Sequence, residues 1–587
     1  MVQLGESRFM VIDLPAQGEA RESKIGRREL ERIHSRPPGV GRDPSQYIFK
    51  ESDMKRHIRD SYHVAGEGII CMGPKGEPIV DSQPGDVASI RKFRFSRMGP
   101  KGAPFSRSIL LALADKMTEN GGGDSAAPAI PAGFTYLGQF IDHDLTMDKT
   151  AKALGENVTL DELLQGRSPA LDLDSMYGRG PGDAEDAKFY KDGMRLKMGA
   201  TAPTPVPDGR TNLALDGFDL PRAGEGPTKV ARRAALIPDH RNDENLVVAQ
   251  VHLAMIRFHN RVVNHLAPNT PSADLFERAR EQVVKHYQWM IRTDFLPRIV
   301  DAAIVDDVFA SGRKFFEANT KPENMPTMPL EFSVAAYRLG HSMIRDAYQW
   351  NRVFKTGGLT EATLKLLFQF SGTSGILSID GDLNDRESGS FEQLPTNWIA
   401  DFRRLFDFRE SGRTDLNAPE GGPNVAKMID TQLVDPLKAL PFGSFGGSPA
   451  TPVEELNLAF RNLVRANMVE LASGQQMAEL FELPPLGAAV LTRGLPDSLV
   501  EVGKRAPLWY YILREAEMNG GKLTGVGGRI VAETFHRAME GSSHSIVRDR
   551  AFRPTALVQN AGDRFKMTDL LLFAFENRSD LLNPLGD

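Results

Sequence analysis

The chain of 587 residues contains a single cysteine, Cys71. No intrachain disulfide can therefore form, and a zinc site built from several thiolates is excluded. No apolar run reaches the roughly 18 residues that a membrane-spanning helix needs. Long runs of lysine and arginine are also missing, and the net charge of -6 gives no reason to expect a nucleic-acid partner.

The first residues, MVQLGESRFM, lack the pattern of a secretory leader. Such a leader combines a basic stretch, a long apolar run and a cleavage site made of small residues. We therefore expect a cytoplasmic protein. Secretion without a leader would leave no mark in the sequence.

The composition is that of a globular protein, with 41% hydrophobic and 25% charged residues. Residues 1–95 are mixed in character and contain several Gly/Pro turns, so we expect an N-terminal extension of unknown role. From Ser106 onward, amphipathic segments are separated by loops rich in glycine and proline, and alternating strand patterns are scarce. The sequence predicts a mainly α fold, with a single large helical domain over residues 96–587 and few short strands.

Three predicted helices contain most of the candidate residues. The first runs from Glu244 to about Leu266 and has one continuous buried stripe. The third, over residues 453–474, is expected to end at Gly474, because glycine favours the C-terminal ends of helices. The second, FSVAAYRLGHSMI at residues 332–344, places four residues on one face: Val334, Tyr337, His341 and Ile344.

The segment GQFIDHDLTMD contains Gln139, Asp142, His143 and Asp144 in an otherwise apolar stretch. Unpaired charges would be costly to bury there. One explanation is a capped helix end with solvated acids. The alternative is chemical: a histidine held neutral in an apolar cleft can move protons, and the two acids can point to opposite sides.

Two further segments suggest a cofactor. Arg241 and Glu244 are three residues apart at the entry to a predicted buried helix. This spacing fits either an ion pair at a helix cap or a cofactor site. His341 follows Gly340 on an apolar face, where it is either a core residue or a ligand to haem iron. A ligand histidine needs an acceptor for its other ring N–H, and the predicted buried Asn462 can supply it.

The acidic loop SPALDLDSMYG favours a cation site. Ser168, Ala170, Asp172 and Asp174 alternate, so their oxygens converge on one side of an extended chain. Calcium takes six to eight such oxygen ligands, although a solvated acidic turn has the same composition. A second acidic loop, residues 380–391, is rejected as a calcium loop because Phe391 stands where the closing glutamate belongs.

Taken in order, the segments GQFIDHDLT, SPALDLDSMYG, DHRNDENLVVAQVHLAMIRFHNRVV, YRLGHSMI and LAFRNLVR resemble the animal-type haem peroxidases of the peroxidase–cyclooxygenase superfamily. The resemblance spans roughly residues 105–550. It implies a haem b group and a bound Ca²⁺. It also implies the use of hydrogen peroxide as the oxidant.

The resemblance also assigns the roles of individual residues. His143 becomes the distal histidine, Gln139 its neighbour and Arg241 the distal arginine. His341 becomes the iron ligand and Asn462 its hydrogen-bond partner, while Arg338 and Arg465 meet the haem propionates. Asp142 and Glu244 occupy the positions that form ester bonds to haem methyl groups. The calcium ligands are Asp144, Ser168, the Ala170 carbonyl, Asp172 and Asp174.

Departures from the family pattern narrow the expected activity. Asn245 replaces the methionine that forms a sulfonium link to haem in myeloperoxidase-like members, so bromide, iodide, thiocyanate or phenolic donors are favoured over chloride. Oxygenase members carry a radical-forming tyrosine at the position of Arg338. Tyr337 is expected about 100° away on the helix, which disfavours fatty-acid oxygenation. The lack of disulfides suggests a bacterial-type member.

Two alternatives to a peroxidase stay open. One is a haem-dependent fatty-acid oxygenase or a catalase-like enzyme. The other is a non-catalytic helical scaffold that has lost its haem. The sequence does not indicate the physiological donor, the number of haem esters or the oligomeric state.

Overall fold

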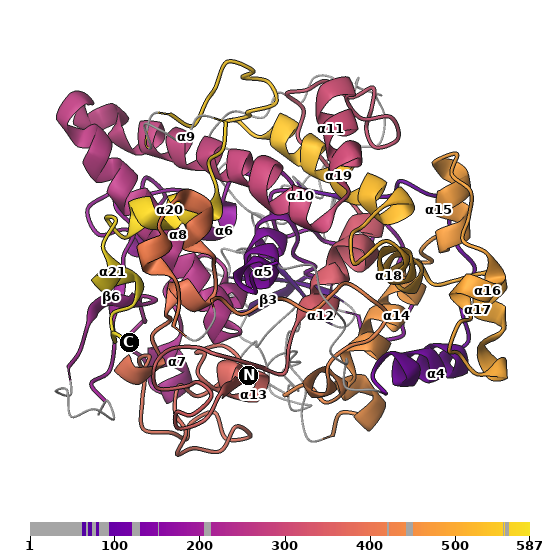
Figure 1. Cartoon of the computed structure of the whole chain (residues 1–587), viewed down its shortest axis with the longest axis horizontal. Coiled ribbons are helices and arrows are strands. Elements are labelled where there is room, and N and C mark those ends of the chain that lie inside the picture. The colour runs from indigo at the N-terminus through magenta and orange to yellow at the C-terminus, as the bar shows by residue number, and fades with distance from the viewer. Residues whose placement is uncertain are drawn as a thin grey trace.

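The computed structural model describes residues 62–65, 68–72, 78–81, 93–119, 130–150, 152–204, 213–419, 422–441, 450–555, 557 and 563–587. Most of the predicted extension, residues 1–95, lies outside these ranges. Helices make up most of the regular structure, which confirms the prediction of a mainly α fold (Figure 1). No helix among the described residues has the length and apolar character required to cross a bilayer.

The longer helices are α4 (Arg107–Met117), α5 (Gly133–Leu145), α8 (Leu246–Leu266), α9 (Ser272–Met290), α11 (Ala302–Ser311), α14 (Leu458–Met468), α18 (Leu508–Met518), α19 (Gly525–Gly541) and α20 (Met567–Ala574). The shorter ones are α6 (Asp174–Tyr177), α7 (Lys229–Arg233), α10 (Leu296–Ile299), α12 (Gly340–Met343), α13 (Leu364–Gln369), α15 (Gly474–Leu480), α16 (Ala488–Leu491), α17 (Glu501–Lys504) and α21 (Ser579–Leu582).

Short strands pair in four small sheets within the described part of the chain. The antiparallel sheet β1-β2-β3 contains β1 (Tyr62–Ala65), β2 (Gly68–Met72) and β3 (Pro78–Asp81). β4 (Phe95–Ser96) pairs in parallel with β7 (Met328–Pro329). The antiparallel pairs are β5 (Gly199–Ala200) with β6 (Asp216–Asp219), and β8 (Ala347–Tyr348) with β9 (Ala362–Thr363).

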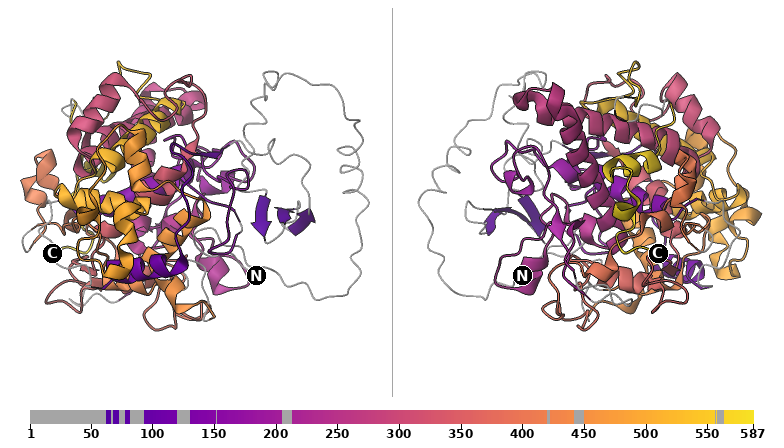
Figure 2. Two further views of the ribbon diagram at one scale, coloured as in Figure 1. Left: turned by 90° about the vertical axis from the view of Figure 1, so that its right-hand side faces the viewer. Right: turned by 60° about the vertical axis from the view of Figure 1, so that its left-hand side comes forward.

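Helix α5 lies at the centre of the molecule, among α8, α12 and other helices (Figure 1). α9 and α19 lie on one side of it, and α4 with α14 lies on the other (Figures 1 and 2). Gly133 is the first residue of α5, and glycine is required there because a Cβ would lie 2.4 Å from the Phe406 ring. One hydrophobic cluster includes buried residues from Phe95 to Leu585 and surrounds this helix.

Helix α8 forms close to where the sequence predicts it. Its apolar stripe is buried, and it ends at Leu266 as expected. Its first residue is Leu246 rather than Glu244, because the Asn245 side chain accepts a hydrogen bond from the Val248 N–H at 2.9 Å and caps the helix. The cap fixes the position of Glu244, which lies immediately before it.

The predicted helix over residues 332–344 is wrong in its geometry. The segment consists of a π-helical turn at Glu331–Ala335, a 3-10 turn at Ala336–Leu339 and the short helix α12. Ala335, with φ -130° and ψ -72°, leaves the helical region and breaks the hydrogen-bond ladder. The regular 100° rotation per residue therefore does not apply between Tyr337 and Arg338.

The helix predicted to end at Gly474 ends earlier, at Met468 in α14. Gly474 instead begins α15, which is capped by Ser473 and Gln476 in a reciprocal capping box. A Cβ at Gly474 would lie 2.0 Å from the Tyr511 ring, so close packing rather than helix termination accounts for this glycine.

Candidate active site

A mostly apolar cavity lies against α5 and unites residues that are distant in the sequence. Six of the candidate site residues line it: Gln139, Asp142, His143, Glu244, Arg338 and His341. The rest of its wall is largely aromatic and aliphatic, including Phe134, Phe295, Leu364, Phe368, Leu437 and Leu458. Asn462 lies behind His341, and neither Arg241 nor Arg465 is among the lining residues of the described chain.

His143 is buried, with 1% of its surface exposed. Its Nδ1 lies 2.9 Å from the Asn242 Oδ1. Because an amide oxygen only accepts hydrogen bonds, this contact places the ring hydrogen on Nδ1 and leaves a lone pair on Nε2. The sequence analysis missed Asn242, although its position beside Arg241 could have suggested it.

Arg241 forms hydrogen bonds to the C-terminal end of α5. Its Nη2 donates to the carbonyl oxygens of His143 at 3.0 Å and Thr146 at 2.6 Å, and its guanidinium also bonds the Asp239 carboxylate. Burial would raise the pKa of Asp239, but Arg241 lowers it to about 2. The other partner of Asp239 is Arg167, whose Nε donates to it at 2.6 Å.

His341 has the hydrogen-bond partner that the sequence suggested. The Asn462 Nδ2 lies 2.9 Å from the His341 Nδ1, and Arg338 donates to the Asn462 Oδ1 at 3.4 Å. In this orientation the amide nitrogen faces the ring. Rotating the amide by 180° would present its oxygen to an Nδ1–H group and leave the Nε2 lone pair for a metal.

Asn245 and Tyr337 also belong to the cavity wall. Asn245 donates from Nδ2 to the Gln139 Oε1 at 2.9 Å, which fixes Gln139. Tyr337 was expected on the same face as His341, and both residues line the cavity. Arg338 lines it as well, because the irregular turns at residues 331–339 do not follow a regular helical rotation.

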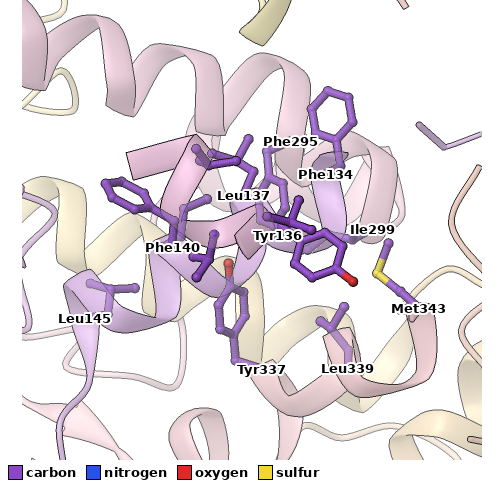
Figure 3. Packing of buried hydrophobic residues seen from close by; sticks show 14 of the residues in the cluster. Phe134, Tyr136, Leu137, Phe140, Leu145, Phe295, Ile299, Tyr337, Leu339 and Met343 are labelled. Atoms are coloured by element: carbon purple, nitrogen blue, oxygen red, sulfur yellow. The ribbon is translucent and has the colours of Figure 1, made fainter. Parts of the chain in front are cut away.

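The Tyr337 ring stacks on Phe332, with centroids 4.6 Å apart, and points toward α5 (Figure 3). A Cβ on Gly138 would lie 3.9 Å from the Tyr337 hydroxyl oxygen. That hydroxyl is buried and has no hydrogen-bond partner among the described residues. Burial raises its pKa well above the usual value, and the Asp142 charge raises it further, so it stays a neutral donor.

The side of α5 that bears Asp144 contacts a different site. Two residues along a helix differ by 200° in direction, so Asp142 lines the cavity while Asp144 points elsewhere. The carboxylates of Asp144, Asp172 and Asp174 each offer an oxygen within 4.8 Å of the others. Burial raises the pKa of Asp172 to about 6, and the Asp174 charge adds to this effect.

The other predicted calcium ligands surround the same cluster. The Ser168 Oγ donates to Asp172 at 2.8 Å, and the Ala170 carbonyl accepts from the Asp172 N–H at 3.0 Å. The Asp144 carboxylate accepts from the Ser175 hydroxyl at 3.1 Å. All five predicted ligands are therefore together. The buried carboxylates of Asp144 and Asp174 and the half-buried carboxylate of Asp172 repel one another, which is a reason to expect a cation between them.

Arg338 and Arg465 both act on Asp148, which the sequence analysis did not single out. Burial raises the pKa of Asp148, while hydrogen bonds from Thr150 and the charges of Arg465 and Arg338 lower it. The two arginines predicted to meet propionates therefore share one neighbourhood. Arg338 is the one that belongs to the cavity wall.

Comparison with known proteins identifies a similar family. Residues 149–418 match the family model described as Animal haem peroxidase, which is slightly less than half of the chain. The matched range includes Arg241, Glu244 and His341, while His143 and Asn462 lie outside it.

Curated relatives match only parts of this chain. It is 28% identical over 338 residues to a peroxidase-like protein of Margaritifera margaritifera, a match that covers 50% of this chain and 42% of that protein. It is 27% identical over 120 residues to a chorion peroxidase of Aedes aegypti, covering 19% of this chain and 15% of the relative. The chain therefore spans less than half the length of these curated relatives.

Among solved structures, the fatty acid alpha-dioxygenase of Arabidopsis thaliana is similar to this chain, with a TM-score of 0.50 and 13% identity. The match covers 84% of this chain and 78% of that one. At this identity, the likeness concerns the fold alone.

Proposed function

We propose that the protein is a haem peroxidase that uses hydrogen peroxide to oxidise small donors. The observation that carries the proposal is the cavity lined by both His143 and His341, which come from distant segments. Each imidazole has one ring nitrogen occupied by an asparagine. The two asparagines therefore fix the orientation of the two imidazole rings.

The wall of the cavity fits a haem group. Its leucine and phenylalanine side chains suit a flat macrocycle, and His341 backed by Asn462 suits the iron. Arg338 and Arg465 would bind the propionates. Asp142 and Glu244 lie on the wall where the proposed ester bonds would form. When bound, haem supplies the iron and its redox chemistry, and the chain supplies orientation and proton transfer.

His143 is the proposed proton carrier. Because Asn242 accepts the Nδ1 hydrogen, Nε2 would take a proton from one oxygen of hydrogen peroxide and return it to the other, which leaves as water when the O–O bond breaks. The two electrons for this cleavage, and the acceptor for the remaining oxygen, would come from the haem group when it is bound. Arg241 is bonded to Asp239 and to two carbonyl groups. We therefore assign it the role of holding His143 in place.

The acidic cluster is the proposed calcium site, with Asp144, Ser168, Ala170, Asp172 and Asp174 as ligands. Support comes from the proximity of three carboxylates, two buried and one half-buried, and from the raised pKa of Asp172. Calcium there would fix the end of α5, which carries both Asp144 and His143. The ion would thus have a structural role beside the cavity.

We infer that the donors are bromide, iodide, thiocyanate or small phenols. Asn245 lies on the cavity wall and donates to Gln139, so it provides no sulfonium link to withdraw electrons from haem. A haem group without that link is a weaker oxidant, so the oxidation of chloride is disfavoured.

A second candidate function is the oxygenation of an apolar substrate. The observation that favours it is Tyr337, which lines the cavity and has no hydrogen-bond partner among the described residues. Oxygenase members use a tyrosine near the iron, and here Tyr337 is the tyrosine next to the Arg338 position. The largely apolar wall would accept a hydrocarbon chain.

The experiment that tests these proposals uses haem-supplemented protein. We expect a Soret band, and we expect oxidation of iodide and guaiacol that depends on peroxide. His341→Ala should lose the band. Consumption of oxygen with a fatty acid, in the absence of peroxide, would favour the second candidate. A wild-type protein that binds no haem would contradict both. Denaturing extraction followed by mass analysis would show whether haem stays bonded to Asp142 and Glu244.

A further inference from the structure

The cavity that contains His143 and His341 is called the haem cavity below. A second cavity, of about 950 Å³, lies away from it. Its wall comes from α9, the π-helical turn at Ile291–Phe295, α11, α19 and the segment 546–553. Ligand pockets of proteins typically measure about 300–1,000 Å³. The second cavity is therefore large enough for an organic molecule, and we call it the arginine cleft.

Four arginines line the arginine cleft: Arg292, Arg548, Arg550 and Arg553. Two of the three acids in its wall already pair with arginines. Glu540 bonds Arg313 at 2.8 Å, and Asp563 bonds Arg553 at 3.1 Å. The third acid, Glu323, is exposed. The wall thus has an excess of positive charge over its unpaired negative charge.

Arg292 lines the cleft, and its guanidinium group lies near two aromatic rings. Its guanidinium carbon is 5.9 Å from the Trp289 ring centroid and 5.0 Å from that of Phe309. No described residue forms a hydrogen bond or ion pair with its side chain, although Asp306 acts on it through space. The rings fix the guanidinium plane while its N–H edges stay available.

Two further groups can donate to an anion in the same cleft. Arg550 is exposed and its side chain has no ion pair or hydrogen bond in the described structure. The His536 Nδ1 accepts from the Arg313 Nη1 at 2.6 Å, so the ring hydrogen of a neutral His536 is on Nε2. Burial and the surrounding arginines lower the pKa of His536 to about 3, which keeps it neutral.

We propose that the arginine cleft binds a small aromatic carboxylate. The planar edge of Arg292 matches the two oxygens of a carboxylate, and Arg550 adds a second positive charge. Trp289, Phe309 and the half-buried Val547 provide apolar contact for a ring. A polyanion is disfavoured because the wall also contains three acids and the protein has a net charge of -6.

The cleft is a site separate from the haem cavity, although the two share a structural element. The turn at Ile291–Phe295 carries Arg292 in the cleft and Phe295 on the haem-cavity wall. Binding in the cleft therefore needs no access to His143 or His341. A ligand that occupies the haem cavity should not compete for the cleft.

The test is the equilibrium binding of benzoate to the haem-supplemented protein, measured by titration calorimetry. Benzamide serves as the uncharged analogue. We expect one saturable benzoate site and at least about tenfold weaker binding of benzamide. Arg292→Gln and Arg550→Gln should each weaken benzoate binding at least about tenfold. Arg278→Gln is the matched control. Arg278 is exposed on α9, the helix that precedes the turn containing Arg292, and it does not line the cleft.

Two measurements keep the test independent of folding defects and of the haem site. Added salt should weaken benzoate binding in the wild type, because part of the arginine charge is exposed. Cyanide, which binds haem iron, should leave benzoate binding unchanged. Equal binding of benzamide, wild-type affinity in both cleft variants, absence of saturable binding, or displacement by cyanide would overturn the proposal.

Discussion

At the scale of single residues, the contacts around His143 support the proposed role of its imidazole as a base. Asn242 accepts the Nδ1 hydrogen, and Arg241 fixes the backbone on either side of the ring. The sequence located His143 and Arg241 through their motifs. It did not show Asn242 or Asp239, because their roles depend on a hydrogen bond and an ion pair that only the folded chain reveals.

His143→Ala should react with hydrogen peroxide at least ~10²-fold more slowly, because it removes the general base. Haem content should stay that of the wild type, because His341 remains. Stopped-flow absorbance of the haem band measures the rate. Asn242→Leu is a companion variant that keeps the imidazole but removes its acceptor, so its pH–rate profile should shift. A His143→Ala rate close to that of the wild type would remove His143 from this role.

Tyr337→Phe separates the two candidate functions. Its hydroxyl is buried and lacks a partner among the described residues, so removing it should leave the melting temperature unchanged or raise it. Peroxide-dependent iodide oxidation should stay within about twofold of the wild type, since proton transfer through His143 is intact. If oxygenation of fatty acids occurs in the wild type, it should disappear in this variant. Loss of peroxidase turnover would instead place Tyr337 in the peroxidase reaction.

At the scale of elements, regular helices were predictable and irregular turns were not. The apolar stripe of α8 identifies it in the sequence because every residue advances the helix by the same angle. The segment Glu331–Met343 changes from π to 3-10 to α geometry, so its sequence spacing gives no constant direction. The angle expected between Tyr337 and Arg338 therefore does not apply, while the Asn462 partner of His341 was found.

The acidic cluster beside α5 is the proposed calcium site, and we expect calcium binding there to depend on pH. The pKa of Asp172 is raised in the fold from 3.8 to about 6. The folded, calcium-free chain then holds more protons than the unfolded chain, so its stability falls as pH rises from about 4 to about 6. Calcium binds the deprotonated acids and removes this penalty. The gain in melting temperature on adding calcium should therefore be larger at pH 7 than at pH 5, as calorimetry can measure.

Two variants check that this effect belongs to the acidic cluster. Asp144→Asn should abolish the calcium-dependent gain in melting temperature at both pH values. Asp382→Asn, in the exposed acidic loop rejected as a calcium site, should leave the gain unchanged. A gain that is equal at pH 5 and pH 7, or one that Asp144→Asn retains, would count against a cation between these carboxylates.

At the scale of the whole molecule, buried charges connect the acidic cluster to the cavity. Arg167 is fully buried and contacts Asp174 of the cluster at 3.6 Å and Asp239 at 2.6 Å. Asp239 in turn bonds Arg241, which holds the end of α5. The chain order of these residues did not reveal the connection, because it joins segments that only the folded core brings together.

Arg167→Met should therefore weaken both sites at once. Removing one partner from a buried ion pair costs about 3 kcal/mol, because the carboxylate that remains is buried without its counter-charge. We expect a lower melting temperature, weaker calcium binding, and faster loss of haem to an apomyoglobin acceptor. Arg261→Met, at an exposed arginine whose nearest carboxylate is 3.9 Å away, provides the matched control and should change none of the three. If Arg167→Met lowered the melting temperature but left calcium affinity and haem loss unchanged, the buried chain of charges would stabilise the fold without coupling the two sites.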